Sequence, residues 1–222
     1  TSLVPVNQPI VAFTASTQSQ EVLLSTGDGR MVSLSAPQAD SLLRETGITR
    51  GDEELDYQQT IRETEIHTLT TPRCGAYQLR LADGTQVWLN AETEIRYPVQ
   101  FTGDKRVVYL DGEAYFTVAP DKNKPFTVIS THASVSVLGT QFNFRAYPDE
   151  RDVQTTLVSG SVIMQSEKYK QQIKLVPGEQ GVLEKNSAKL MKQEVNTYLY
   201  TAWKDGRFAF RDARLEDLFN IL

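Results

Sequence analysis

The chain has 222 residues, of which 40% are hydrophobic and 23% are charged, and its formal net charge is −5. These values are typical of a folded globular protein and argue against disorder along the whole chain. The net negative charge also argues against nucleic acid as the main partner, because phosphate binding depends on clustered Lys and Arg.

The charge is unevenly distributed along the chain. Residues 1–75 contain 5 Lys and Arg against 10 Asp and Glu, whereas residues 76–222 contain 18 of each kind. We therefore place a boundary near residues 73–75. The acidic segment at residues 50–65 carries most of the excess, and we interpret it as a solvated connector.

Two stretches near the N-terminal side, residues 22–36 and 77–91, align without a gap at an offset of 55 residues. Each contains an Asp-Gly pair between runs of alternating apolar and polar residues. Asp-Gly favours the type I′ turn of a two-residue hairpin, because both central residues of that turn have positive φ. The repeat therefore predicts a repeated hairpin, with residues 9–36 adding strands to the same sheet or stack. The shared positions are Leu24/Leu79, Asp28/Asp83, Gly29/Gly84, Val32/Val87, Leu34/Leu89 and Ala36/Ala91.

The rest of the chain is also dominated by short alternating runs. Residues 38–47 fit a short helix that Gly47 ends. The pair Asp111-Gly112 predicts a further hairpin within residues 108–119. Strands are then expected at residues 125–130, 133–139, 141–147, 152–160, 161–166, 172–184 with a Pro-Gly turn, and 188–195. Strand and turn units at this spacing indicate a mainly β fold, and sandwich, barrel and solenoid all remain open.

The C-terminal end changes character. Residues 203–210 predict a turn leading into a strand, and residues 212–222 predict an amphipathic helix with Asp212 as its N-cap. The sequence has no initiating Met and stops within this helix, so we expect a fragment of a longer protein. The longest apolar runs have four residues, whereas a membrane helix needs about 20. No membrane helix or signal peptide is predicted.

The residues that usually carry catalysis or bind metals are scarce. The two histidines, His67 and His132, are far apart in sequence, and Cys74 is the one cysteine, which rules out an intramolecular disulfide. Structural or surface placement is the interpretation of all three. The acid pairs Glu92/Glu94 and Asp111/Glu113 have strand spacing, which would place each pair on one face. The sequence therefore predicts no catalytic site, metal or cofactor, and a protein that is not an enzyme.

Residues 81–98, "LADGTQVWLNAETEIRYP", are the first segment that is similar to a known protein family. This segment resembles the FecR family, the iron-citrate-type transmembrane regulators that act as anti-sigma factors. The likeness continues in family order through residues 103–128, 137–150, 155–162, 175–180 and 202–219, about two-thirds of the chain in all. The preceding "HTLTTPRCGAYQLRLADG" resembles Bacteroides-type members, in which we expect Gly at the position of Cys74.

The resemblance implies a domain organisation. Residues 76–200 would form the FecR core, a solenoid-like or sandwich-like all-β unit. Residues 201–222 would hold the first strand and helix of a small α+β unit that resembles the secretin and TonB short N-terminal (STN) fold. The charge distribution and the repeated hairpin, rather than the resemblance, predict that residues 1–75 are an acidic, hairpin-containing segment that packs on the core.

The resemblance also implies partners and a location. The chain would be the periplasmic sensing and relay portion of a protein anchored in the inner membrane, and it would contact the signalling domain of a TonB-dependent outer-membrane transporter. A sigma factor would be reached only through a cytoplasmic segment beyond a membrane helix, both absent from this sequence. The residues expected to contact the partner are Trp203, Arg207, Phe208, Phe210, Leu215, Leu218 and Phe219.

A second hypothesis is an extracytoplasmic carbohydrate-binding or hydrolytic β module. Such a module would show a cleft with two carboxylates about 5–10 Å apart or a row of exposed aromatic rings. The repeated hairpin does not discriminate between the two hypotheses, because we interpret it as a structural feature.

Overall fold

The computed structural model describes residues 21–44, 47–51, 54–57, 65–73, 75–187 and 189–207. Three predicted features lie outside these residues: any strand before residue 21, the side chain of Cys74, and the strand and helix expected after residue 207. The described elements are β1 (Leu23–Ser25), β2 (Met31–Ser33), α1 (Ala39–Arg44), β3 (Thr49–Arg50), β4 (Glu54–Asp56), β5 (Ile66–Thr70), β6 (Tyr77–Arg80), β7 (Gln86–Leu89), β8 (Glu94–Pro98), β9 (Arg106–Thr117), β10 (Phe126–Ile129), β11 (Ala133–Val137), β12 (Gln141–Ala146), β13 (Asp152–Ser159), β14 (Val162–Ser166), β15 (Gln172–Leu175), β16 (Glu179–Glu184), β17 (Leu190–Glu194), α2 (Tyr198–Thr201) and the 3₁₀ helix η1 (Ala202–Asp205).

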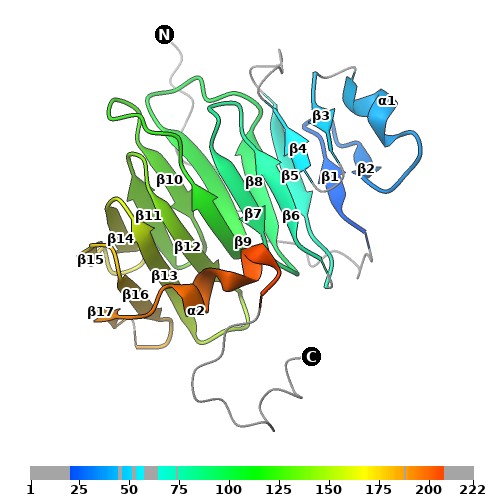
Figure 1. Ribbon diagram of the computed structural model, residues 1–222. Helices are drawn as coiled ribbons and strands as arrows, with labels where there is room; N and C mark the ends of the chain where they lie inside the picture. The colour runs from blue at the N-terminus through cyan, green and yellow to red at the C-terminus, as the bar shows by residue number, and fades with distance from the viewer. Residues whose placement is uncertain are drawn as a thin grey trace, which may run out of the picture.

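The 17 strands formed by the described residues make one continuous hydrogen-bonded set that folds into two layers (Figure 1). The long strand β9 joins the layers, because its first half pairs with β8 and β10 and its second half pairs with β7 and β12. The first layer has the order β2-β1-β5-β8-β9-β10-β11-β14-β15. The second layer has the order β3-β4-β6-β7-β9-β12-β13-β16-β17. The mainly β prediction is confirmed, and the arrangement is a sandwich.

Apolar side chains from both layers meet between them, as alternation along a strand requires. In β8, Ile95 and Tyr97 are buried while their neighbours along the strand are partly exposed. Phe116 of the second layer stacks on Phe142 with ring centroids 5.0 Å apart. Its ring also lies 6.1 Å from that of Phe126 in the first layer. The core therefore lies between the layers and contains aromatic rings from both.

The two copies of the repeated stretch form the β1–β2 and β6–β7 hairpins, one in each layer. The hairpins are confirmed, but the predicted type I′ turn is wrong. Gly29 N–H donates to Thr26 C=O, and Gly84 N–H donates to Leu81 C=O, both at 2.9 Å. In each turn only the glycine has positive φ, +85° in Gly29 and +84° in Gly84. This is a three-residue loop, in which a type I turn is followed by a left-handed glycine.

The hairpin predicted at Asp111-Gly112 is wrong. β9 runs through both residues as a single 12-residue strand, and it crosses from the first layer to the second at Gly112, whose φ is +115°. The strand continues because β7 and β12 supply hydrogen-bond partners to its second half. A turn at this point would leave those neighbours without a central strand.

The solvated connector predicted over residues 50–65 is also wrong in part. Residues 54–56 form β4, which pairs in parallel with β6. Leu55 and the following Tyr57 are fully buried. The acidic side chains of Glu54 and Asp56 alternate with them and lie 3.2 and 3.6 Å from Arg80 Nε. The acids therefore mark the outer face of a strand.

The remaining predictions fit the structure closely. The helix expected at residues 38–47 is α1, and Gly47 follows it with φ +76°. The seven strand segments expected after residue 125 correspond to β10–β17, with Gly178 in the turn between β15 and β16. None of the helices formed by the described residues has the length and hydropathy needed to span a bilayer. The domain boundaries at residues 75 and 200 stay predictions.

Candidate functional site

The C-terminal segment crosses the outer face of the second layer. Figure 1 shows α2 and η1 running from the β17 side of the sheet toward β9. Thr201 and Ala202 are buried against the sheet. Trp203 Nε1–H donates to Oδ1 of Asn143 at 3.1 Å. Because this bond joins residues 60 positions apart in sequence, it fixes the segment at one place on the face.

Asn143 is itself held by a buried carboxylate. Its Nδ2 donates to Oε1 of Glu113 at 2.8 Å, across the β9–β12 ladder. Glu113 Oε2 accepts from Asn90 Nδ2 at 2.9 Å and from Arg145 Nη1 at 2.6 Å. Glu113 is only 4% exposed, so three donors compensate for burying its charge. We call Asn90, Glu113, Asn143, Arg145 and Trp203 the docking network.

Arg145 extends the docking network to the loop after β12. Its guanidinium pairs with the carboxylate of Glu150 and lies 4.9 Å from the ring centroid of Tyr147. Burial raises the pKa of Tyr147 to about 12, so its hydroxyl stays protonated at neutral pH. That hydroxyl donates to the Ala91 carbonyl at 2.7 Å. The network therefore ties two loops and the two strands β9 and β12 to the C-terminal segment.

A second contact lies beside Trp203. Lys204 Nζ sits 5.2 Å from the ring centroid of Tyr115 and 5.9 Å from that of Trp88. The two rings meet edge to face at 5.8 Å. Such cation–π contacts contribute roughly 0.5–1 kcal/mol each at partly exposed sites. The segment is thus held by the hydrogen bond from Trp203 to Asn143 and by the cation–π contacts of Lys204 with two aromatic rings.

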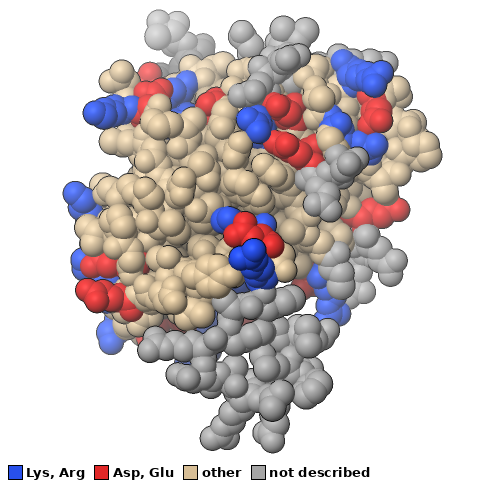
Figure 2. All heavy atoms as spheres, in the orientation of Figure 1, with Lys and Arg blue, Asp and Glu red and all other residues tan. Residues whose placement is uncertain are grey.

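The face around this segment has few charges. Figure 2 shows a broad uncharged area, with one charged patch near its middle and most of the Lys, Arg, Asp and Glu side chains toward its borders. The cross-strand register places neutral polar side chains outward here. Depletion of charge with aromatic residues present is typical of the central part of protein–protein interfaces. The neutral polar residues on this outer side of the layer are Gln141, Asn143, Gln154, Thr156, Gln180 and Gln193, of which Asn143, Thr156 and Gln180 are buried.

The two predicted acid pairs are not arranged as expected. Asp111 and Glu113 lie on opposite sides of the layer crossing at Gly112, so they occupy the outer faces of different layers. Glu92 lies in the turn before β8, with φ +51°. Instead, Glu94 and Asp111 face each other directly on β8 and β9. In the part of the chain that the structure describes, no three His, Cys, Asp or Glu side chains gather as metal ligands would.

The Glu94 and Asp111 pair predicts a pH-dependent stability. Burial raises the pKa of both carboxyl groups, and the Asp111 charge raises that of Glu94 further. A raised pKa means that the folded protein holds its proton more tightly than the unfolded chain, so stability falls as the pH rises through the raised values. We expect Asp111→Asn to stabilise the protein by roughly 0.5 kcal/mol at pH 7, a small value because both groups are partly exposed and water screens their charges. Urea unfolding at pH 7 and below the ordinary carboxyl pKa measures this.

The gain should vanish at the lower pH, where both carboxyl groups are protonated in either state. Asp104→Asn, an exposed aspartate before β9, makes the same change in net charge and is the control. An equal gain from Asp104→Asn would show that net charge rather than this pair is responsible.

The buried polar side chains also include a cluster that joins the layers. Tyr57 follows β4 in the second layer, and its hydroxyl is hydrogen-bonded to His67 Nδ1 of β5 at 2.8 Å. The Tyr97 hydroxyl of β8 donates to the Tyr57 oxygen at 3.0 Å, and His67 Nε2 lies 3.2 Å from Glu65. Burial raises the pKa of the Tyr57 and Tyr97 hydroxyls well above the usual range for tyrosine. His67 thus lies in the core, whereas His132 is partly exposed.

A polar cavity of about 290 Å³ opens near Arg106 and is lined in part by Asp83 and Asp121. Both carboxylates bond within the chain. Asp83 Oδ2 accepts from Arg106 Nη1 at 2.7 Å, and Asp121 Oδ1 accepts from the N–H groups of Asn123 and Lys124. These bonds give both acids a structural role in the loops at this end of the sandwich.

The structure describes only two of the residues predicted to contact the partner, Trp203 and Arg207. Trp203 contacts the chain's own sheet through Asn143, and Arg207 is exposed, with its backbone N–H donating to Ala202 C=O at 3.1 Å. The other predicted residues, Phe208, Phe210, Leu215, Leu218 and Phe219, lie outside the described residues. Sequence reasoning missed Asn90, Asn143 and Arg145, and it considered Glu113 only as a member of an acid pair. The one local signal was a charged Glu113 within the apolar second half of β9.

Comparison with known proteins gives a consistent result. The family model described as "FecR protein" matches residues 67–163, which include Asn90, Glu113, Asn143 and Arg145 but not Trp203. No curated protein matches the chain. Two crystal structures of a candidate anti-sigma factor from Parabacteroides distasonis ATCC 8503 are similar. The 2.50 Å structure is 31% identical, covers 70% of this chain and 72% of that chain, and has a TM-score of 0.64. The 1.65 Å structure is 32% identical, covers 69% of this chain and 72% of that chain, and has a TM-score of 0.63.

Proposed function

The chain belongs to the FecR family, and we propose that it is the periplasmic sensing and relay portion of an anti-sigma factor. In this proposal the signalling domain of a TonB-dependent outer-membrane transporter contacts the chain. The signal then passes to an extracytoplasmic-function sigma factor through a membrane helix and a cytoplasmic segment of the full-length protein. The chain acts through protein contacts and catalyses no reaction.

The observation that carries this proposal is the attachment of the C-terminal segment to the sandwich. The partner contact is expected at and beyond Trp203, and Trp203 is bonded to Asn143, which Glu113 fixes in the centre of the sheet. A force or a shift applied to the C-terminal segment therefore acts directly on β9 and β12. Packed side chains and hydrogen bonds of this kind can carry coupling between a contact region and a core.

The carbohydrate-module hypothesis has weaker support. The acids that line the polar cavity are engaged in ion pairing with Arg106 or in capping a loop. The aromatic pair Trp88 and Tyr115 is occupied by Lys204 of the C-terminal segment. A sugar would have to displace this segment to reach those rings.

Calorimetric titration against the transporter's signalling domain tests the proposal. We expect saturable binding by a chain extended beyond Leu222 and little or no binding by the 222-residue chain. That outcome would place the contact at or beyond Trp203. Binding by both chains would move it into the β sandwich, and binding by neither would count against the relay function.

A substitution at Trp203 examines the docking network within the same experiment. Trp203→Phe keeps a ring but removes the Nε1–H donor to Asn143. We expect about fivefold weaker binding by the extended chain, since a net hydrogen bond contributes about 1 kcal/mol to ordering the contact region. Tyr109→Phe changes an exposed aromatic residue on the first layer, away from the C-terminal segment, and should leave affinity nearly unchanged.

A further inference from the structure

One edge of the first layer is open. Among the described residues, β2 pairs only with β1. Thr26 N–H donates to Arg30 C=O and Leu34 N–H donates to Val22 C=O, both at 2.9 Å. Bonded and non-bonded positions alternate along an antiparallel ladder, so the N–H and C=O of Met31 point away from β1. An open row of this kind is a template on which another extended backbone can pair.

The other edges of the sandwich carry features that discourage pairing. At the opposite end, β15 and β17 present the charged side chains of Lys174, Lys192 and Glu194. In the second layer, Arg50 of β3 pairs with Asp40 of α1 at 2.7 Å. By contrast, β2 has the uncharged sequence Met-Val-Ser, and the side chain of Met31 is 65% exposed. Charges on an edge strand act against strand addition, and β2 lacks them.

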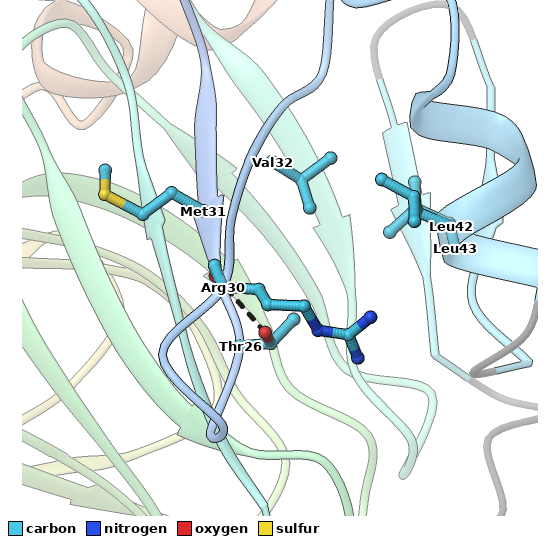
Figure 3. Close-up of a pocket in the computed structure, with 6 residues that line it drawn as sticks. All are labelled: Thr26, Arg30, Met31, Val32, Leu42 and Leu43. Atoms are coloured by element: carbon cyan, nitrogen blue, oxygen red, sulfur yellow. Dashed lines mark hydrogen bonds between the residues drawn. The ribbon is translucent and has the colours of Figure 1, made fainter.

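An apolar cavity of about 180 Å³ lies beside this edge (Figure 3). Figure 3 shows Val32 of β2 and the two leucines of α1, Leu42 and Leu43, pointing toward one another across it, with Met31 directed to the other side of β2. A strand added to β2 would lie beside this cavity and would contribute side chains to both sides. The edge therefore offers apolar contact in addition to backbone hydrogen bonds.

We propose that β2 pairs in antiparallel orientation with β2 of a second copy of this chain, with Met31 on the two-fold axis. The carbonyl of Ser33 already accepts from Ala36 N–H at 3.1 Å, so Met31 is the strand residue with both backbone groups available. Met31 facing Met31 of the second copy makes two equivalent bonds, as an isologous contact requires. The same register brings Ser33 N–H to the Gly29 carbonyl of the second copy. It also places Val32 of each copy beside Arg30 of the other, next to the cavity.

The short edge limits the strength of this contact. A standard stable interface buries about 1,600 Å², and two three-residue strands bury far less. The association is therefore weak and concentration-dependent, with a Kd on the order of 0.1 mM. Confinement of two copies to one membrane surface would raise their effective concentration.

Sedimentation equilibrium over a series that reaches millimolar protein tests the proposal. The 222-residue chain should shift from monomer to dimer, and Met31→Lys should keep it monomeric by placing a charge on the edge. Ile163→Lys is the matched control, because Ile163 is 45% exposed but lies on β14, inside the layer. A monomer at every concentration, or an equal loss of association in both variants, would overturn the proposal.

Disulfide trapping provides an independent readout. Facing residues of a hydrogen-bonded antiparallel pair have Cα atoms about 5.5 Å apart, which is within disulfide range. In a Cys74→Ser background, Met31→Cys should form a covalent dimer under mild oxidation faster than Ile163→Cys does. Equal rates for the two cysteine variants would contradict pairing at Met31.

Discussion

Replacing Gly112 with alanine is expected to lower the free energy of unfolding by about 3 kcal/mol or more. At this position φ is +115°, a conformation that a residue with a Cβ adopts only with strain. A Cβ would also meet Thr93, approaching its Oγ1 closely and lying 2.7 Å from its Cα. Because Thr93 Oγ1 accepts from Glu113 N–H at 2.9 Å, Thr93 cannot move away without loss of that bond. Urea denaturation followed by circular dichroism measures the change.

Substitutions at two other glycines separate the backbone strain from the steric contact in this loss of stability. Gly29 has φ +85° and open space around it. Gly29→Ala should therefore lower the free energy of unfolding only through backbone strain, by roughly 1 kcal/mol. Gly103 has neither a positive φ nor a close neighbour, so Gly103→Ala should be nearly neutral. If Gly112→Ala were no worse than Gly29→Ala, β9 would not pass so close to Thr93 where it crosses between the layers.

Gly112 also shows why local sequence could not predict this crossing. The chain contains Asp-Gly between alternating runs at residues 28–29, 83–84 and 111–112. The first two pairs form hairpin turns, whereas the third lies within one strand. The difference arises from β7, β8, β10 and β12, which flank β9 on both layers. Pairing with distant strands decides between a turn and a continuous strand, and no local pattern contains that information.

Prediction of the fold succeeded where apolar alternation was clear. The strands from β10 to β17 and the helix α1 follow from periodicity and turn residues. It failed at β4, where Glu54 and Asp56 suggested a solvated connector, although Leu55 and Tyr57 between and after them are buried. Charged residues on the outer face of a strand are common, so composition alone was a poor guide.

The site was less predictable than the fold. Trp203 was found through the family resemblance, but its acceptor Asn143 was not. Asn143 and Glu113 meet because β9 and β12 pair in one register, and a slip of a single residue would turn both side chains to the other face. A buried carboxylate with three donors is a property of that register and of the folded layers.

Replacing Asp83 with asparagine is expected to destabilise the protein by about 3 kcal/mol. The side chains of Asp83 and Arg106 are 15% and 3% exposed, and the ion pair between them is 2.7 Å long. Arg106 also donates from Nη1 to Ala119 C=O and from Nε to Lys124 C=O, which holds the guanidinium between the layers. Asparagine keeps the acceptor that Thr85 N–H uses in the turn, but it leaves the buried guanidinium without a neutralising charge.

The repeat supplies a matched control for this prediction. Asp28 occupies the equivalent turn and pairs with Arg30 at 2.8 Å, but those side chains are 43% and 48% exposed. Solvent screens that pair, so Asp28→Asn should have only a small effect on the midpoint of urea unfolding. A double variant, Asp83→Asn with Arg106→Met, should recover much of the stability lost in Asp83→Asn, because it removes the uncompensated charge. Equal losses at Asp28 and Asp83, or no recovery in the double variant, would show that the turn rather than the buried charge determines the effect.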